Sequence, residues 1–297
     1  MASLVVGLTT FSVAVLPTQV AEAGTDTVTN CSGSPLVSGS LPYEVASASP
    51  GDIIGFALSP PCSTITLTST ITIDEDLTIT GPGAGVLAVS GGGVVQVFGV
   101  GPVTATISGL TIKDGTDEGT GYGGGIESSG MLTIANCTVS GNDSSYDGGG
   151  IYNGGTLTVQ NSTVSGNTAV AYGGGIVNAN AAAASVTDST VSDNVAVGST
   201  QTFGGGIYNG EGTLTLTDST VSNNQASSTY GYGGGVDNSG TLTVTSSTLS
   251  DDDATFVGGG IANIVGTVNI ANSTLSEDMA GDGGGGRAPG QRSADRL

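Results

Sequence analysis

A glycine triplet returns along the chain at a nearly constant interval, and this repeat constrains the fold more than any other feature. The triplets begin at Gly123, Gly148, Gly173, Gly204, Gly233, Gly258 and Gly283. Subtracting successive positions gives intervals of 25, 25, 31, 29, 25 and 25 residues. A period in this range is the sequence signature of a solenoid, in which each repeat forms one coil that stacks on the next.

Within one repeat, residues 148–172, apolar residues alternate with small polar ones. Alternation with a period of two places the two kinds of residue on opposite faces of a strand. We therefore expect three short strands in each coil: one around Ile151, one across Leu157 and Val159, and one around Val164. Glycine and asparagine lie between them, where turns are expected.

Stacking the coils places equivalent residues in columns. Three apolar columns would form the core: Ile126, Ile151, Ile176, Ile207, Val236 and Ile261; Ile134, Val159, Val186, Leu216, Val244 and Ile270; and Val139, Val164, Val191, Val221, Leu249 and Leu275. Two asparagine columns would mark corners, where left-handed backbone is tolerated: Asn153, Asn178, Asn209, Asn238 and Asn263; and Asn142, Asn167, Asn194 and Asn224. The sequence predicts an all-β fold, a single-stranded right-handed parallel β-helix with coils of about 25 residues.

The Gly-Gly-Gly-Ile-x-Asn segment with Val-Ser-Gly-Asn downstream resembles the repeats of polymorphic outer membrane proteins and of other bacterial surface β-helix proteins. The resemblance covers residues 90–286 and, more weakly, residues 50–90. It implies the pectin lyase-like fold. Because that scaffold also carries pectin lyases, adhesins and ice-binding proteins, the resemblance implies no single function.

Composition divides the chain into five segments. Residues 1–23 are predicted to be a signal peptide, since an apolar run precedes a small-x-small cleavage site. Residues 24–51 are expected to cap the solenoid, residues 52–122 to form irregular early coils, and residues 123–286 to form the regular repeats. Residues 287–297 break the pattern and are expected to be a disordered or truncated tail. The predicted location is outside the cell or on its surface.

The N-terminal cap is expected to contain a short helix. Ser40 can accept a hydrogen bond as its N-cap, Pro42 fits the first turn, and Leu41 and Val45 form an apolar stripe. This segment also resembles the one that heads many bacterial surface β-helix proteins. The opposite end of the solenoid would present an open strand edge, which favours end-to-end or edge association.

The charge balance argues against several partners and reactions. The formal net charge is −21, which disfavours nucleic acid and anionic membranes, and no transmembrane segment is expected in the mature chain. Enzymes resembling this fold use an Arg or Lys base with Asp-bound Ca²⁺, or paired Asp residues with a His. This chain has no His, and Lys113 is the one basic residue of the β-helix body. The sequence therefore favours a non-catalytic protein and leaves an enzyme as the open alternative.

An aromatic residue precedes six of the triplets by one or two positions: Tyr122, Tyr146, Tyr172, Phe203, Tyr232 and Phe256. We expect these rings to form a column beside the longer loops Val195–Phe203 and Gln225–Tyr232. The candidate ligand-binding residues are Tyr146, Tyr172, Phe203, Tyr230, Tyr232 and Phe256. Aromatic faces beside a loop suit a sugar or peptide ligand, and the alternative is that the rings seal the corner by stacking on each other.

Acidic and cysteine residues provide further candidates. Asp251, Asp252 and Asp253 lie at a turn, where carboxylates suit Ca²⁺, or they form a solvated corner. Cys31 and Cys62 precede the regular repeats, and the sequence leaves open whether they form a disulfide. Cys137 occupies a column of serines in the other coils and is expected to be a small substitution without a reactive role.

These features favour a secreted or cell-surface, non-catalytic β-helix with an adhesive or structural role. Surface glycans, or proteins of a host or neighbouring cell, are the expected partners, and no cofactor is expected apart from the calcium ion considered above. The alternative is a carbohydrate-binding or carbohydrate-active protein that uses the aromatic corner. Outward Thr-x-Thr arrays, such as Thr156 and Thr158, leave ice binding as a third reading.

Overall fold

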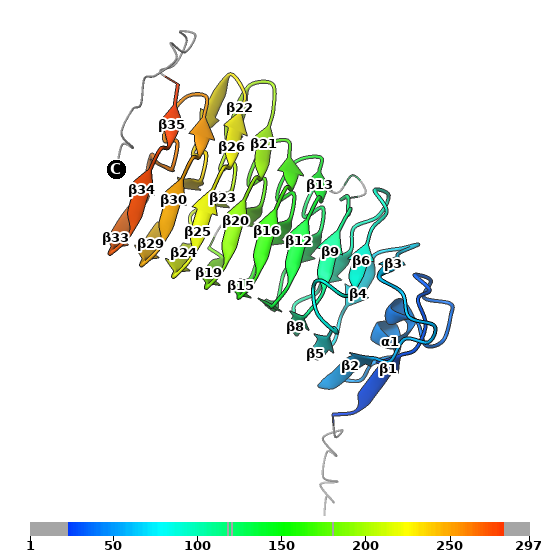
Figure 1. The fold of residues 1–297 in the computed structure, drawn as a ribbon. Coiled ribbons are helices and arrows are strands. Elements are labelled where there is room, and N and C mark those ends of the chain that lie inside the picture. The colour runs from blue at the N-terminus through cyan, green and yellow to red at the C-terminus, as the bar shows by residue number, and fades with distance from the viewer. Residues whose placement is uncertain (1–22, 118, 120, 180, 282–297) are drawn as a thin grey trace, which may run out of the picture.

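The computed structural model describes residues 23–117, 119, 121–179 and 181–281, and these residues form a right-handed parallel β-solenoid of about nine turns (Figure 1). All the strand pairs between these residues are parallel, so the predicted fold class is confirmed. The expected signal peptide up to residue 22 and the expected tail, residues 287–297, lie outside the described residues.

Sheets A, B and C each take one strand from successive coils. Sheet A contains β1 (Thr25–Val28), β2 (Asp52–Phe56), β5 (Leu77–Thr80), β8 (Thr104–Ser108), β11 (Met131–Ala135), β15 (Thr156–Gln160), β19 (Ala183–Thr187), β24 (Thr213–Thr217), β29 (Thr241–Thr245) and β33 (Thr267–Ala271). Sheet B contains β3 (Thr64–Thr66), β6 (Ala88–Ser90), β9 (Thr111–Lys113), β12 (Thr138–Ser140), β16 (Thr163–Ser165), β20 (Thr190–Ser192), β25 (Thr220–Ser222), β30 (Thr248–Ser250) and β34 (Thr274–Ser276). Sheet C contains β4 (Ile71–Ile73), β7 (Phe98–Val100), β10 (Ile126–Ser128), β14 (Ile151–Asn153), β18 (Ile176–Asn178), β23 (Ile207–Asn209), β28 (Val236–Asn238) and β32 (Ile261–Asn263).

Two further sheets were not predicted. Sheet D contains β13 (Asp143–Ser144), β17 (Thr168–Ala169), β21 (Val195–Val197), β26 (Gln225–Ser227), β31 (Asp253–Ala254) and β35 (Met279–Ala280). Sheet E pairs β22 (Gln201–Phe203) with β27 (Tyr230–Tyr232), both from the longer loops. The inward residues of sheet D include Ala169, Ala196 and Ala226, whose small side chains gave no apolar signal in the sequence.

The three predicted apolar columns are confirmed by strand register. Ile151 pairs with Ile126 and Ile176, Val159 with Val186, and Val164 with Val191. All seven are fully buried, and the coils that carry them lie about 4.8 Å apart, so each side chain packs on its equivalent above and below. The columns therefore form one continuous core along the solenoid axis.

The two asparagine columns are also confirmed, although the asparagines themselves do not have the left-handed backbone that was expected. Asn178 accepts a hydrogen bond from Asn153 at 2.8 Å and donates to Asn209 at 2.7 Å, and Asn167 likewise donates to Asn194 at 2.9 Å. These amides are fully buried, and they also donate to backbone carbonyls, as Asn167 does to Val139. The left-handed residue of this corner is the one before the asparagine, for example Gly166 or Asp193.

The glycine triplet permits the close approach of neighbouring coils. Its first residue has a left-handed backbone, with φ of +55° at Gly173. At the second position, a Cβ atom on Gly174 would lie 2.4 Å from the carbonyl oxygen of Gly205 in the next coil. Because real Cβ atoms do not approach so closely, only glycine fits both positions.

The N-terminal segment includes the expected helix. Helix α1 (Leu41–Ser47) has Ser40 as its N-cap, Pro42 in its first turn, and Leu41 and Val45 buried. The segment is more than a cap, because β1 already forms the first strand of sheet A. Cys31 and Cys62 form a disulfide in the structure, with their Cα atoms 6.3 Å apart. In the described part of the chain, no helix has the length and apolar character needed to cross a membrane.

Replacing Gly174 with Ala tests the role of the triplet. The added methyl group overlaps the backbone of the next coil, so we expect the free energy of unfolding to fall by at least about 2 kcal/mol in urea denaturation. Gly55→Ala is the matched control, because its Cβ atom would lie 3.9 Å from the nearest atom, the Asp26 carbonyl oxygen. Equal effects of the two substitutions would contradict this account of the triplet.

Candidate functional site

Two parallel rows of side chains lie on the outer side of sheet C. The first, which we call the strand row, comes from the middle residue of each sheet C strand: Glu127, Tyr152, Val177, Tyr208, Asp237 and Ala262. The second, which we call the turn row, comes from the residue that precedes each glycine triplet: Tyr122, Asp147, Tyr172, Phe203, Tyr232 and Val257. Both rows follow the stacking of the coils.

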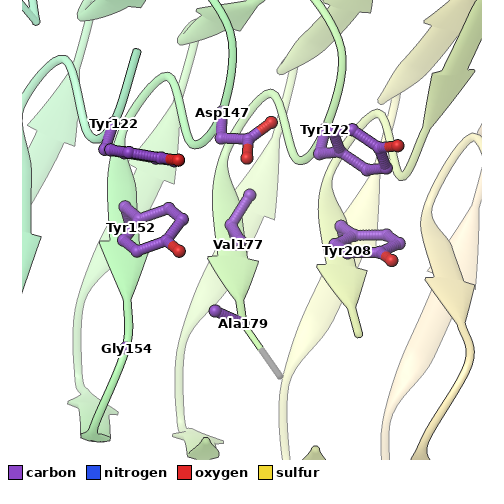
Figure 2. Close-up of a pocket in the computed structure, with 8 residues that line it drawn as sticks. All are labelled: Tyr122, Asp147, Tyr152, Gly154, Tyr172, Val177, Ala179 and Tyr208. Carbon is purple, nitrogen blue, oxygen red and sulfur yellow. The ribbon is translucent and has the colours of Figure 1, made fainter. Parts of the chain in front are cut away.

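The turn row lies over the strand row, and Tyr122 and Tyr172 each contact the strand residue of the next coil. The ring centroids of Tyr122 and Tyr152 are 4.7 Å apart, as are those of Tyr172 and Tyr208. Figure 2 shows these two tyrosine pairs on either side of Asp147, which lies above Val177. The carboxyl group is therefore flanked by an aromatic pair on each side.

Asp147 interrupts a stack of aromatic rings. Tyr172 stacks on Phe203 with a centroid distance of 5.0 Å and an interplanar angle of 10°, and Phe203 stacks on Tyr232 at 5.1 Å and 7°. On the other side of Asp147 the column resumes with Tyr122. Two coil steps of about 4.8 Å separate Tyr122 from Tyr172, so a slot of about 9.6 Å between ring positions opens where one ring is missing.

The slot is part of a surface groove with a volume of about 460 Å³. Its walls and floor come from Tyr122, Asp147, Tyr152, Gly154, Tyr172, Val177, Ala179 and Tyr208. This size lies within the range of pockets that hold small organic ligands, and a lining of aromatic rings with one ionisable group is typical of them. We call this feature the tyrosine groove.

One oxygen of the Asp147 carboxyl group has no compensating partner. This Oδ1 atom is shielded from solvent and accepts no hydrogen bond from the described residues. Burial raises the pKa of Asp147 to about 7, because the charged form loses hydration without gaining a hydrogen bond or a cation. The side chain is thus able to change its charge near neutral pH, and a ligand that supplied a donor would stabilise the ionised form.

A second carboxyl group of this kind lies farther along the strand row. Asp237 is 2% exposed, lies beside Tyr208 in register, and has an Oδ2 atom with no hydrogen-bond partner. Burial raises its pKa to about 7 as well. Burial and the charges of Asp237, Tyr172 and Asp147 together raise the pKa of the Tyr208 hydroxyl to about 12, so this phenol stays neutral.

The predicted aromatic column is partly wrong. Tyr146 and Phe256 lie two positions before their triplets, so Asp147 and Val257 take their places in the turn row. The ring of Tyr146 lies beside that of Tyr172, with centroids 5.9 Å apart, and is 51% exposed. Phe256 contacts Tyr232 edge-on at 5.3 Å and Tyr230 at 5.2 Å, away from the tyrosine groove.

Stacking of the rings, the alternative kept open above, applies to one half of the column. Tyr172, Phe203 and Tyr232 seal their corner against each other, and the two longer loops pair beside them as sheet E. The open slot lies at the shorter coils. The sequence reasoning missed Asp147, Tyr152, Tyr208 and Asp237. Aligning the residue before each triplet, and the x of Gly-Gly-Gly-Ile-x-Asn, would have found all four.

The expected calcium cluster does not form. Asp252 points inward and ends an asparagine column, since its Oδ1 atom accepts from the Asn224 side chain at 3.0 Å. Asp251 is exposed at a left-handed turn, and Asp253 lies in β31 with partial exposure. The three carboxylates therefore differ in exposure and direction, and no group of metal-ligating side chains occurs among the described residues. Cys137 is buried among backbone carbonyls, which raises the pKa of its thiol by desolvation.

The carboxyl of Asp237 should make stability depend on pH. Since the pKa of Asp237 is near 7 in the folded chain and near 4 in the unfolded chain, the folded state is favoured when the group is protonated, and stability falls as the pH rises from 4 to 7. We expect Asp237→Asn to raise the free energy of unfolding by on the order of 4 kcal/mol at pH 8 and to change it little at pH 4.

Urea denaturation at both pH values measures this difference. The control is Asp218→Asn, which removes an exposed carboxylate. If Asp237→Asn changes the free energy of unfolding equally at pH 4 and pH 8, ionisation of Asp237 does not destabilise the folded state, and the prediction is wrong.

Comparison with known proteins places the chain in a family. The model of the right-handed β-helix region matches residues 64–278. The crystal structure of pectate lyase Pel9A is similar, with a TM-score of 0.55 and 12% sequence identity, over 92% of this chain and 82% of that one. No curated protein matches the chain. At this identity the structural likeness shows the fold alone, whereas the family model covers most of the sequence. The chain therefore belongs to the right-handed β-helix family.

Proposed function

We propose that this protein is a secreted or cell-surface β-helix that binds an oligosaccharide in the tyrosine groove without cleaving it. The observation that carries the proposal is the slot between two tyrosine pairs, with the Asp147 carboxyl between them and Val177 beneath. Sugar rings present apolar C–H faces to aromatic side chains and hydroxyl donors to carboxylates. One pyranose ring would complete the interrupted stack and donate a hydroxyl hydrogen bond to the Asp147 carboxyl group.

The charges of the groove favour some sugars over others. Pectate, the substrate in the name of the similar lyase, is a polyanion, and its carboxylates would meet Asp147 in a chain of net charge −21. Lys113 lies in sheet B and pairs with Asp114 at 3.2 Å. No basic side chain lines the tyrosine groove, so an anionic sugar would find no counter-charge there. We therefore propose a ligand that carries no negative charge.

Binding without cleavage also fits the chemistry of the groove. Hydrolysis of a glycosidic bond uses two carboxyl groups that flank the bond, and elimination uses a base beside an acidified proton. Among the groove residues, Asp147 is the one carboxyl group. In an adhesive role, a surface solenoid would hold glycans of another cell or of the surrounding matrix. Such a role requires the groove residues for binding and no second catalytic group.

A glycan array followed by calorimetry tests the proposal. We expect a neutral or cationic oligosaccharide to bind, and Tyr172→Ala to weaken that binding about tenfold, because one wall of the slot is lost. Tyr172→Phe keeps the ring and its stacking on Phe203, and should bind nearly as well. Tyr230→Ala removes a 42% exposed ring outside the groove and serves as the control.

Two results would contradict the proposal. The first is an array on which no glycan binds. The second is binding that Tyr172→Ala leaves unchanged, or that Tyr230→Ala weakens as much, since the ligand would then lie elsewhere. Release of product from the bound oligosaccharide would overturn the non-catalytic part alone.

A further inference from the structure

We propose that the group held in the slot is the ammonium group of an amino sugar, bound between the carboxylate of Asp147 and the four tyrosine rings. This inference rests on the proposed function and narrows its ligand class from uncharged or cationic sugars to hexosamines with a free amine.

The first support is the unsatisfied carboxyl group. Asp147 belongs to the groove lining, and its Oδ1 atom is shielded from solvent and accepts no hydrogen bond from the described residues. A buried carboxylate without a partner is unfavourable, and a charge-assisted hydrogen bond from an ammonium group is the strongest compensation that a ligand can offer. Among the described residues, the groove thus offers a receptor for positive charge and no cation of its own to fill it.

The second support is the arrangement of the rings around that carboxyl. Tyr122 and Tyr152 lie on one side, and Tyr172 and Tyr208 on the other (Figure 2). With ring positions about 9.6 Å apart, a cation midway between them lies about 5 Å from both walls, within the range of about 6 Å at which tyrosine faces attract cations. Aromatic walls around a carboxylate form the kind of cage that binds organic ammonium groups.

The third support is the charge of the surroundings. The titratable groups around Asp147 are the four tyrosine hydroxyls, and Glu127 and Asp237 lie farther along the strand row. Burial is the main cause of the raised pKa values of Tyr152 and Tyr172. The charges of Asp147 and Glu127 add to the shift at Tyr152, and those of Asp147 and Asp237 add to the shift at Tyr172, so the carboxylates make the field at the groove negative. Such a field favours a cationic ligand over a neutral one of the same shape.

The size of the groove favours an ammonium group on a sugar ring over a small free amine. Its volume of about 460 Å³ extends beyond the slot to Gly154 and Ala179 at the edge of sheet C. A methylammonium ion would leave most of this space to water. A hexosamine places its ring between the tyrosine walls and extends its neighbouring units along the groove.

The experiment compares two trisaccharides of the same skeleton, one of glucosamine and one of N-acetylglucosamine, by calorimetry at physiological salt. We expect the glucosamine trisaccharide to bind at least about tenfold more tightly, and Asp147→Asn to abolish that preference while leaving the acetylated sugar nearly unaffected. Asp218→Asn makes the same change in net charge at an exposed site and should leave the preference intact. Thermal unfolding of each variant confirms that it folds.

Proton release provides an independent readout. At pH 6 the carboxyl of Asp147, with its pKa near 7, is mostly protonated, and a bound ammonium group would lower that pKa and expel the proton. Calorimetry in buffers of different ionisation enthalpy should therefore show nearly one proton released per glucosamine trisaccharide bound. The acetylated sugar and the Asp147→Asn variant should release none.

Each remaining outcome overturns the inference in a distinguishable way. Equal binding of the two sugars, weakened by Tyr172→Ala, would remove the amine preference and leave the proposed function standing. If Asp147→Asn and Asp218→Asn weakened binding of the glucosamine trisaccharide equally, its preference over the acetylated sugar would come from the net charge of the protein and not from the Asp147 carboxylate. If neither sugar bound, and no glycan on the array did, the inference and the proposed function would both fail.

Discussion

The close approach of successive coils, in register and about 4.8 Å apart, is the constraint on which the rest of the molecule depends. Gly174 illustrates the steric part of this constraint, because a methyl group there would overlap a carbonyl oxygen of the next coil. The buried amides of Asn167 and Asn178 depend on the same spacing, since each donates a hydrogen bond to the equivalent residue one coil away as well as to backbone carbonyls. With the backbone fixed in this way, every side-chain position becomes a row with a fixed spacing, on the surface as well as in the core.

A fixed spacing turns one changed residue into a surface feature. Rings fill the turn row at Tyr172, Phe203 and Tyr232 and stack on one another, and Asp147 leaves a space of one ring between Tyr122 and Tyr172. The space persists because the coils on both sides hold their own positions and cannot relax into it. The same rigidity keeps the Asp147 carboxyl shielded and without a protein partner, which is why its pKa is raised.

The fold was predictable from the sequence because its signals are repeated many times. The triplets, the Ile151 column and the Asn178 column each occur in coil after coil, so the register follows from alignment alone. The site was predictable only in its location. Counting aromatic residues near each triplet selected Tyr146, whereas the left-handed glycine at Gly148 fixes the preceding residue, Asp147, in the row. A shift of one residue reverses the direction of a side chain on an extended backbone, and composition does not reveal it.

The inward turn of Asp252 follows from the same alternation. Three successive aspartates suggest a shared metal ion, but Asp251 lies exposed at a left-handed turn, whereas Asp252 points inward and continues the asparagine column from Asn224. The extra residues of the long coils form sheet E, which ends at Phe203 and Tyr232. These two rings already stack on each other, so the long coils leave no space between rings there. The slot lies instead at the short coils. In this solenoid the proposed ligand site arises from a substitution within the repeat, whereas the insertions extend the part of the column in which the rings already stack on each other.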